Sequence, residues 1–192
     1  MVDRRAFLKR ASLGALAVGS MSTRAEAVVR SASEDEGRIN FHFDCQVNGP
    51  LVGNVQHFLA MAGCGSFNNA DDDADVEGGG GFLHIDSNSA VPKTIFDSGS
   101  WKARRLLSFQ PFGNPYGVFQ AGIAHLGIDL VHVVPSRLVV PATLRIVCNV
   151  APAGAASITG LPESIVLDVD GLVFSQPVAG LTVFTIGEEE KD

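Results

Sequence analysis

Ile39-Asn40-Phe41-His42-Phe43-Asp44-Cys45-Gln46-Val47 places an apolar side chain at every odd position and a polar one at every even position. Side chains of a β-strand point alternately to its two faces, so this spacing predicts a strand that is buried on one face only. The turn-forming residues 48–50, Asn-Gly-Pro, end it. We therefore expect an ordered β-domain that begins at Ile39.

Strand-like runs, most of them separated by turn residues, continue along the chain. They cover residues 82–86, 94–97, 103–110, 116–134, 137–150, 163–169, 172–175 and 181–186. Many short strands with few helices are typical of antiparallel sandwiches and barrels. We expect one all-β domain over residues 39–187, built as an antiparallel β-sandwich, with a β-barrel as the alternative.

Two of these runs are expected to form the central hairpin. The run 116–134 is long for one strand, and the glycines at 117, 122 and 127 suit bulges or bends in it. Pro135 and Ser136 permit a return along residues 137–150. Pro141 in that second run indicates an edge position or a break, because proline lacks the N–H that a central strand needs.

One short helix and one long loop complete the expected fold. Asn54 is a plausible N-cap for apolar residues spaced three and four apart up to Ala62, and Gly63 would end the helix. A strand remains possible there. Residues 66–81 are rich in Asn, Asp and Gly, which predicts a surface loop.

The N-terminus carries a motif of another kind. A basic pair followed by Phe-Leu-Lys is formed by Arg4, Arg5, Phe7, Leu8 and Lys9. A weakly apolar run covers residues 11–21, and Arg24 precedes a small-residue site at 25–27, Ala-Glu-Ala. This layout resembles a twin-arginine signal peptide, with Asp3 where such signals usually carry Ser or Thr. The apolar run 11–21 is too short for a bilayer-spanning helix, which needs about 20 apolar residues.

The resemblance implies an exported protein. Its partners would include the twin-arginine export machinery and a signal peptidase, and its location would be periplasmic or extracellular. The mature chain would have a flexible leader at 28–38, the β-domain, and an acidic tail at 188–192. No other segment is long and apolar enough for a helical membrane span, so we expect none in the mature protein.

The mature chain is distinctly acidic. Residues 1–27 hold five basic and two acidic side chains, so their removal changes the net charge from −7 to −10. Binding to nucleic acid or anionic lipid needs a basic surface, which disfavours both as partners.

Three cysteines remain outside the signal, an odd number. Cys45 and Cys148 each fall on the apolar side of an alternating run, so both are expected to face the core. They are either joined by a disulfide bond or packed as two free thiols. Cys64 lies between two glycines and would be the leftover thiol.

A cation is the first ligand to consider. Asp71, Asp73, Asp75 and Glu77 place carboxylates at every second residue, as many calcium loops do. An EF-hand loop beginning at Asp71 would need glycine at position 76 and glutamate at position 82, where the chain has Val and Phe. A solvated acidic loop fits the pattern better, and calcium is a possible rather than an evident cofactor.

Histidines offer a second candidate metal site. His42 and Asp44 share one face of the first strand, and His125 and Asp129 share one face of the long run. Imidazole and carboxylate ligands from neighbouring strands bind metals when they converge. The alternative is that each pair is solvated on a polar strand face.

The basic cluster is a candidate ligand-binding surface. It comprises Trp101, Lys102, Arg104, Arg105 and the later Tyr116. Aromatic and cationic side chains together bind carbohydrates, anions or acidic partners. The alternative places Trp101 in the core with Ala103, Leu107 and Phe109, although simple alternation would then bury Arg105 and expose Leu106.

Motifs for nucleophilic catalysis or phosphate binding are missing, and no cofactor is evident. We therefore expect a non-catalytic, exported β-sandwich with a binding or structural role at the cell envelope. The alternatives are a metal-dependent protein or small enzyme that uses His42 and His125, and a small-ligand carrier with a barrel cavity.

Overall fold

The computed structural model describes residues 38–68, 76–134, 137–151, 153–156 and 158–187. Within these ranges the chain forms ten β-strands and no helix, and every strand pair is antiparallel. The expected all-β, antiparallel domain is confirmed. The signal peptide, most of the leader and the acidic tail lie outside the described residues.

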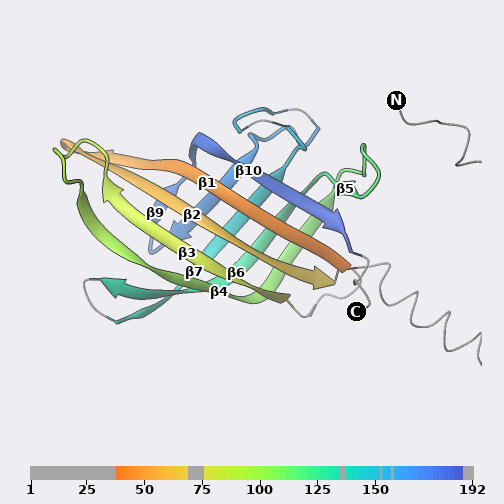
Figure 1. Cartoon of the computed structure of the whole chain (residues 1–192), viewed down its shortest axis with the longest axis horizontal. Coiled ribbons are helices and arrows are strands. Elements are labelled where there is room, and N and C mark those ends of the chain that lie inside the picture. The colour runs from red at the N-terminus through yellow and green to blue at the C-terminus, as the bar shows by residue number, and fades with distance from the viewer. Residues whose placement is uncertain (1–37, 69–75, 135–136, 152, 157, 188–192) are drawn as a thin grey trace, which may run out of the picture. The chain divides into compact units, whose positions relative to one another are not determined.

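All ten strands belong to one sheet, in the order β5-β10-β1-β2-β3-β4-β6-β7-β8-β9 (Figure 1). Their bounds are β1 Arg38–Val52, β2 Val55–Asn68, β3 Val76–Asp86, β4 Thr94–Pro111, β5 Phe119–Gln120, β6 Gly122–Val134, β7 Val139–Cys148, β8 Ser164–Val169, β9 Leu172–Phe174 and β10 Gln176–Ile186.

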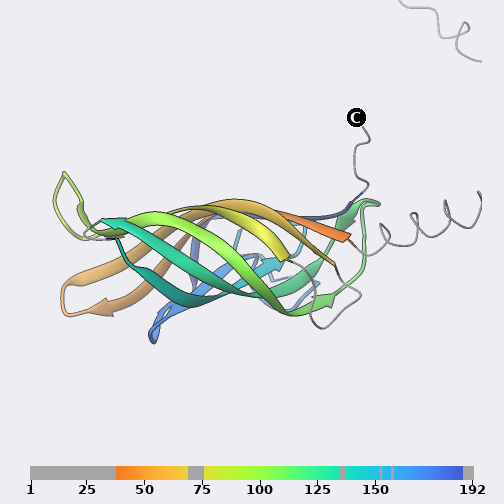
Figure 2. The ribbon, with the colours of Figure 1, turned by 90° about the horizontal axis from the view of Figure 1, so that it is seen from below.

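The sheet is strongly curled, and the long strands bend along their length (Figure 2). The curl brings β8 and β9 against β1, although they are six and seven places from β1 in the pairing order counted through β2. The expected two-sheet sandwich is therefore wrong. A single sheet forms a half-barrel, because the two end strands β5 and β9 do not pair with each other.

The predicted helix at 54–62 is also wrong, since these residues belong mainly to β2. Both neighbours of β2 are strands that satisfy its backbone groups, β1 on one side and β3 on the other. The predicted loop at 66–81 is wrong at both ends for the same reason. Residues 66–68 end β2 and residues 76–81 begin β3, whereas 69–75 lie outside the described residues.

The predicted central hairpin is confirmed as β6 and β7. Pro141 lies in β7 opposite Asp129, two residues before the pairing with β8 begins at Thr143. At that position β7 has a neighbour on one side only, so the missing N–H leaves no gap in a ladder. Two of the three register shifts between β4 and β6 skip a residue of β4, and the third skips Val133 of β6, so none skips a glycine of the long run.

These shifts decide which face of β4 is buried. Pairing with β6 skips Arg104 and Leu107, and each skipped residue reverses the alternation. Leu106 and Phe109 consequently pack against the core, and Arg105 stays exposed. Simple alternation would have given the opposite faces to Arg105 and Leu106.

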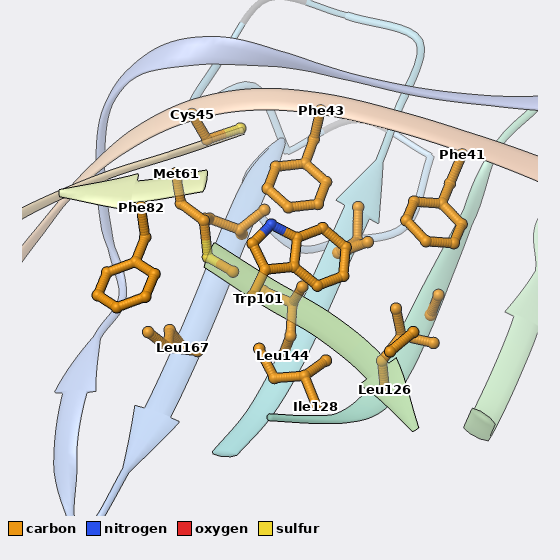
Figure 3. Packing of buried hydrophobic residues seen from close by; sticks show 14 of the residues in the cluster. Phe41, Phe43, Cys45, Met61, Phe82, Trp101, Leu126, Ile128, Leu144 and Leu167 are labelled. Atoms are coloured by element: carbon orange, nitrogen blue, oxygen red, sulfur yellow. The ribbon is translucent and has the colours of Figure 1, made fainter. Parts of the chain in front are cut away.

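Trp101 lies at the centre of the core (Figure 3). Its ring stacks with Phe43 and Phe41 at centroid distances of 5.6 and 6.5 Å. Its indole Nε1 donates a hydrogen bond to the carbonyl oxygen of Ala62 at 3.0 Å, which satisfies the one polar atom of the side chain.

Two glycines make room for this indole. A Cβ on Gly80 of β3 would lie 2.7 Å from Trp101 Nε1 and closer still to the carbonyl oxygen of Ala62. A Cβ on Gly63 of β2 would lie 2.8 Å from Trp101 Cε2. Real Cβ atoms do not come so near, so both positions need glycine if the sheet is to curl around Trp101.

The substitution Gly80→Ala is expected to destabilise the domain by about 1–3 kcal/mol, because overpacking forces the indole or the strand to move. Gly81→Ala is the matched control, since its Cβ would lie 3.7 Å from the nearest atom. The free energy of unfolding in urea and the fluorescence of this single tryptophan measure both. Equal stability of the two variants would contradict the role given to Gly80.

A buried carboxyl joins the strands that the curl brings together. Glu163, fully buried just before β8, accepts hydrogen bonds from the backbone N–H groups of Asn149 and Thr182 and contacts Thr182 Oγ1. Thr182 Oγ1 donates its only proton to the carbonyl oxygen of Val147 at 2.7 Å. Its hydroxyl is also within hydrogen-bond contact of Glu163 Oε1. Burial raises the pKa of Glu163 and so favours protonation of the carboxyl, although the Thr182 hydroxyl and the backbone N–H groups of Asn149, Thr182 and Ala151 oppose the shift.

This protonation predicts a pH dependence of stability. A carboxyl whose pKa is raised in the folded state contributes stability below its ordinary pKa of 4.5 and loses it as the pH rises through the folded value. Glu163→Gln keeps the neutral hydrogen bonds and cannot ionise. Between about pH 4 and about pH 8, urea unfolding should show the wild type losing stability relative to this variant. Parallel pH profiles would contradict the neutral carboxyl.

Candidate functional site

A row of polar side chains crosses the concave face of the sheet on four neighbouring strands. It consists of His57 on β2, His84 on β3, Asp97 on β4 and His132 on β6. His84 is the register partner of Asp97, and Gly99, two residues after Asp97, is the partner of His132. Residues two apart on a strand share a face, so the row lies on the same side as the buried Trp101.

Asp97 and His132 form one half of the row. His132 Nδ1 is in contact with Asp97 Oδ2, and the side chains are 13% and 17% exposed. Burial raises the pKa of Asp97, an effect that His132 opposes by its charge and its hydrogen bond. The edge of the Phe82 ring packs against His132 with centroids 5.5 Å apart, which fixes the imidazole from a second side.

His57 and His84 form the other half. Their Nδ1 and Nε2 atoms lie 2.8 Å apart, so one imidazole donates a proton to the other. Burial, and then the charge of His57, lower the pKa of His84 to about 4, so His84 is neutral at physiological pH. The rings of Phe96 and Phe174 pack against His84, each at 5.0 Å, and hold this pair in place.

The row borders a pocket of about 280 Å³ on the concave face, towards the β3–β4 turn. Its apolar wall comes from β2, β3, β6, β7, β8 and β9, and its polar lining comes from His84, Asp97, His132 and Asp170. The apolar lining residues are Leu59, Phe82, Leu130, Val140, Leu167, Val169, Leu172 and Phe174. Such an apolar concavity with a few converging polar groups is typical of a small-molecule site.

Two atoms of the polar lining have no hydrogen-bond partner within the described residues. They are Asp97 Oδ1 and His132 Nε2, and both are buried. An unsatisfied buried polar group costs about 1–3 kcal/mol, so native proteins rarely leave two of them in one pocket without a use. This pair is the strongest sign of a ligand in the described structure.

The geometry defines the hydrogen bonds that the pair can still make. When Asp97 is ionised and His132 neutral, Nδ1 carries the imidazole proton and Nε2 offers a lone pair. Asp97 Oδ1 also accepts. A histidine oriented by a carboxylate is used in general-base catalysis too, but no Ser, Thr, Cys or Lys lines the pocket to serve as a nucleophile.

The histidines and carboxylates expected to bind a metal lie elsewhere. His42 and Asp44 are exposed on the convex face of β1. His125 and Asp129 lie on the convex face of β6, three strands away from β1 across β2, β3 and β4. Each predicted pair does share a face, but the two pairs do not meet. No group of three metal-ligating side chains occurs within the described residues.

The convex-face residues of β6 have other neighbours. Asp129 Oδ2 pairs with Arg104 Nε at 3.1 Å. Burial, and then the neighbouring Arg145, lower the pKa of His125.

In the expected acidic loop, Asp71, Asp73 and Asp75 lie outside the described residues. Glu77 lies in β3, with its carboxylate 3.8 Å from the guanidinium of Arg38.

The expected aromatic and basic surface is divided between the two faces of the sheet. Trp101 is buried in the core, whereas Lys102, Arg104 and Arg105 are exposed. Tyr116, 67% exposed, lies in the segment before β5. The indole therefore cannot share a ligand with the cations.

The expected disulfide bond is absent, and all three cysteines are free. Cys45 and Cys148 face the core as predicted, but each thiol finds an acceptor on β10 instead of the other sulfur. Cys45 Sγ donates to the carbonyl oxygen of Leu181 at 3.5 Å, and Cys148 Sγ to that of Thr182 at 3.4 Å. Burial raises the pKa of Cys45 to about 12, so it is a poor nucleophile. Cys64 is exposed.

None of the four residues of the polar row was predicted as a site residue from the sequence. His57 falls within residues 54–62, which were predicted to form a helix, so its position in a strand was not predicted. His84 and Asp97 fall inside the predicted strands 82–86 and 94–97, and pairing these two as a hairpin would have placed them near each other. His132 could be assigned to the same end only with the register of β4 and β6 known.

Comparisons with known protein families, with curated proteins and with solved structures yield no match. No helix suited to crossing a membrane occurs among the described residues. The arguments about function therefore rest on the pocket and on the sequence.

Proposed function

We propose that this domain is a non-catalytic, exported protein that binds a small molecule in the concave pocket. The apolar body of the ligand packs against the leucines, valines and phenylalanines of the wall, and a hydrogen-bond donor of the ligand meets His132 Nε2 or Asp97 Oδ1. The observation that carries the proposal is the pair of buried, unpartnered polar atoms, Asp97 Oδ1 and His132 Nε2, in a pocket with a mainly apolar wall. This proposal takes up the expectation of a small-ligand carrier.

The volume limits the size of the ligand. Pockets for drug-sized molecules measure roughly 300–1,000 Å³. A pocket of about 280 Å³ is just below this range and suits a compact molecule of one to three rings. The wall is built on paired strands rather than on loops, which favours a preformed site that loses little entropy when it binds.

The pocket should bind N-phenyl-1-naphthylamine, a neutral apolar fluorophore with a single N–H donor. Val140→Trp on β7 should abolish the fluorescence increase, because the indole would fill the pocket that Val140 lines. Val139→Trp is the control, because Val139 directly precedes Val140 in β7 and is exposed on the opposite face. A titration followed by fluorescence measures all three proteins, and circular dichroism confirms that both variants are folded.

Binding that survives in Val140→Trp would place the probe elsewhere and contradict the proposed site. No binding to the wild type would contradict the proposal itself.

The export part of the proposal rests on the sequence of residues 1–27. Replacing Arg4 and Arg5 by lysine should keep the protein in the cytoplasm with its N-terminus uncut, because the twin-arginine machinery reads both guanidinium groups. Cell fractionation and the intact mass of the protein measure location and cleavage. Release of the lysine variant at the wild-type level would contradict this route.

A further inference from the structure

We infer that the pocket selects protonated amines: its preferred ligand is a compact hydrocarbon that carries an ammonium group. This inference rests on the proposed function, because it specifies the ligand of the same pocket. It follows from the unpartnered carboxylate oxygen of Asp97 and from the charges along the pocket wall.

The charge of the donor separates amines from alcohols. Asp97 Oδ1 and His132 Nε2 have no hydrogen-bond partner in the described structure. Because the two nitrogens of an imidazole point in divergent directions and Nδ1 contacts Asp97, a single donor group meets one of these two atoms. At Asp97 Oδ1 an alcohol offers a neutral donor, whereas an ammonium group offers a cationic N–H. A bond from a cation to the carboxylate is stronger than a bond between neutral groups.

The charges of the lining point the same way. Asp97 lies within the pocket and Asp170 at its exposed rim, in the turn between β8 and β9. No Lys or Arg is among the lining residues. A carboxylate ligand would meet two like charges and no counterion, whereas an ammonium group would meet two opposite charges.

The ammonium group also relieves an existing cost. Asp97 is largely buried; its carboxylate interacts with His132 Nδ1 and with the backbone N–H of Ser98, and Oδ1 has no partner at hydrogen-bond geometry. Burial accordingly disfavours its ionised form. A cation beside Oδ1 would stabilise that form and restore the missing hydrogen bond. The rings of Phe82 and Phe174 line the same pocket and add the attraction of aromatic side chains for cations.

Benzylamine, benzyl alcohol and benzoate test this selectivity, because they share one ring and differ in the polar group. Isothermal titration calorimetry at about pH 8, where imidazoles are ordinarily neutral, measures each affinity directly. We expect benzylamine to bind about tenfold more tightly than benzyl alcohol, the factor that a charge-assisted hydrogen bond in place of a neutral one supplies. Benzoate should bind most weakly.

The variant Asp97→Asn should remove the preference for benzylamine and leave the affinity for benzyl alcohol nearly unchanged, because the amide retains an acceptor for His132 Nδ1–H and loses the charge. Asp168→Asn is the matched control. It removes the same charge from an exposed residue that does not line this pocket, so it should keep the preference.

Equal affinities of the wild type for the three compounds would overturn the inference, even if Asp97→Asn failed to fold. A preference that persists in Asp97→Asn would overturn it as well. In both cases binding of N-phenyl-1-naphthylamine would leave the proposed pocket standing. If neither this fluorophore nor any of the three compounds bound, the proposed function itself would be wrong.

Discussion

The contact between the indole of Trp101 and the backbones of Gly63 and Gly80 is the constraint on which the rest of the structure depends. A large aromatic side chain on β4 lies directly against β2 and β3, and only residues without a Cβ permit this. The sheet can therefore curl around one ring, and the stack of Phe41, Phe43 and Trp101 fills its concave side. A run of glycines that would weaken an ordinary strand here allows the core to form.

The curl also explains why a pocket exists and where it lies. Next to Trp101 the concave face is filled by aromatic and aliphatic side chains, but towards the β3–β4 turn the inward positions carry His57, His84, Asp97 and His132. All four side chains have a partner within the row: His57 contacts His84, and His132 contacts Asp97. Two of their atoms, Asp97 Oδ1 and His132 Nε2, have none, and these residues line the pocket together with residues of β7, β8 and β9.

Sequence reasoning succeeded where structure is local. Alternation at residues 39–47 correctly separated the buried Phe41 from the exposed His42, because a strand alternates whatever its neighbours are. It failed where the outcome depends on pairing. The β-bulges at Arg104 and Leu107 exchange the faces of Arg105 and Leu106, and nothing in residues 101–109 marks them. Predicting the polar row requires the register of four strands. The candidate histidines predicted from the sequence, His42 and His125, each share a strand face with a carboxylate, which the alternation of a single strand reveals.

The central claim is that His132 Nε2 is an acceptor reserved for a ligand. Long-range ¹H–¹⁵N correlation spectra of the histidine-labelled protein test it most directly, because they report the protonation of each ring nitrogen. At about pH 8 we predict a His132 ring protonated at Nδ1, with an unprotonated Nε2 whose resonance moves when N-phenyl-1-naphthylamine is added. The exposed His42 should show no change. A proton on Nε2, or an Nε2 resonance that stays in place at saturating probe, would contradict the claim.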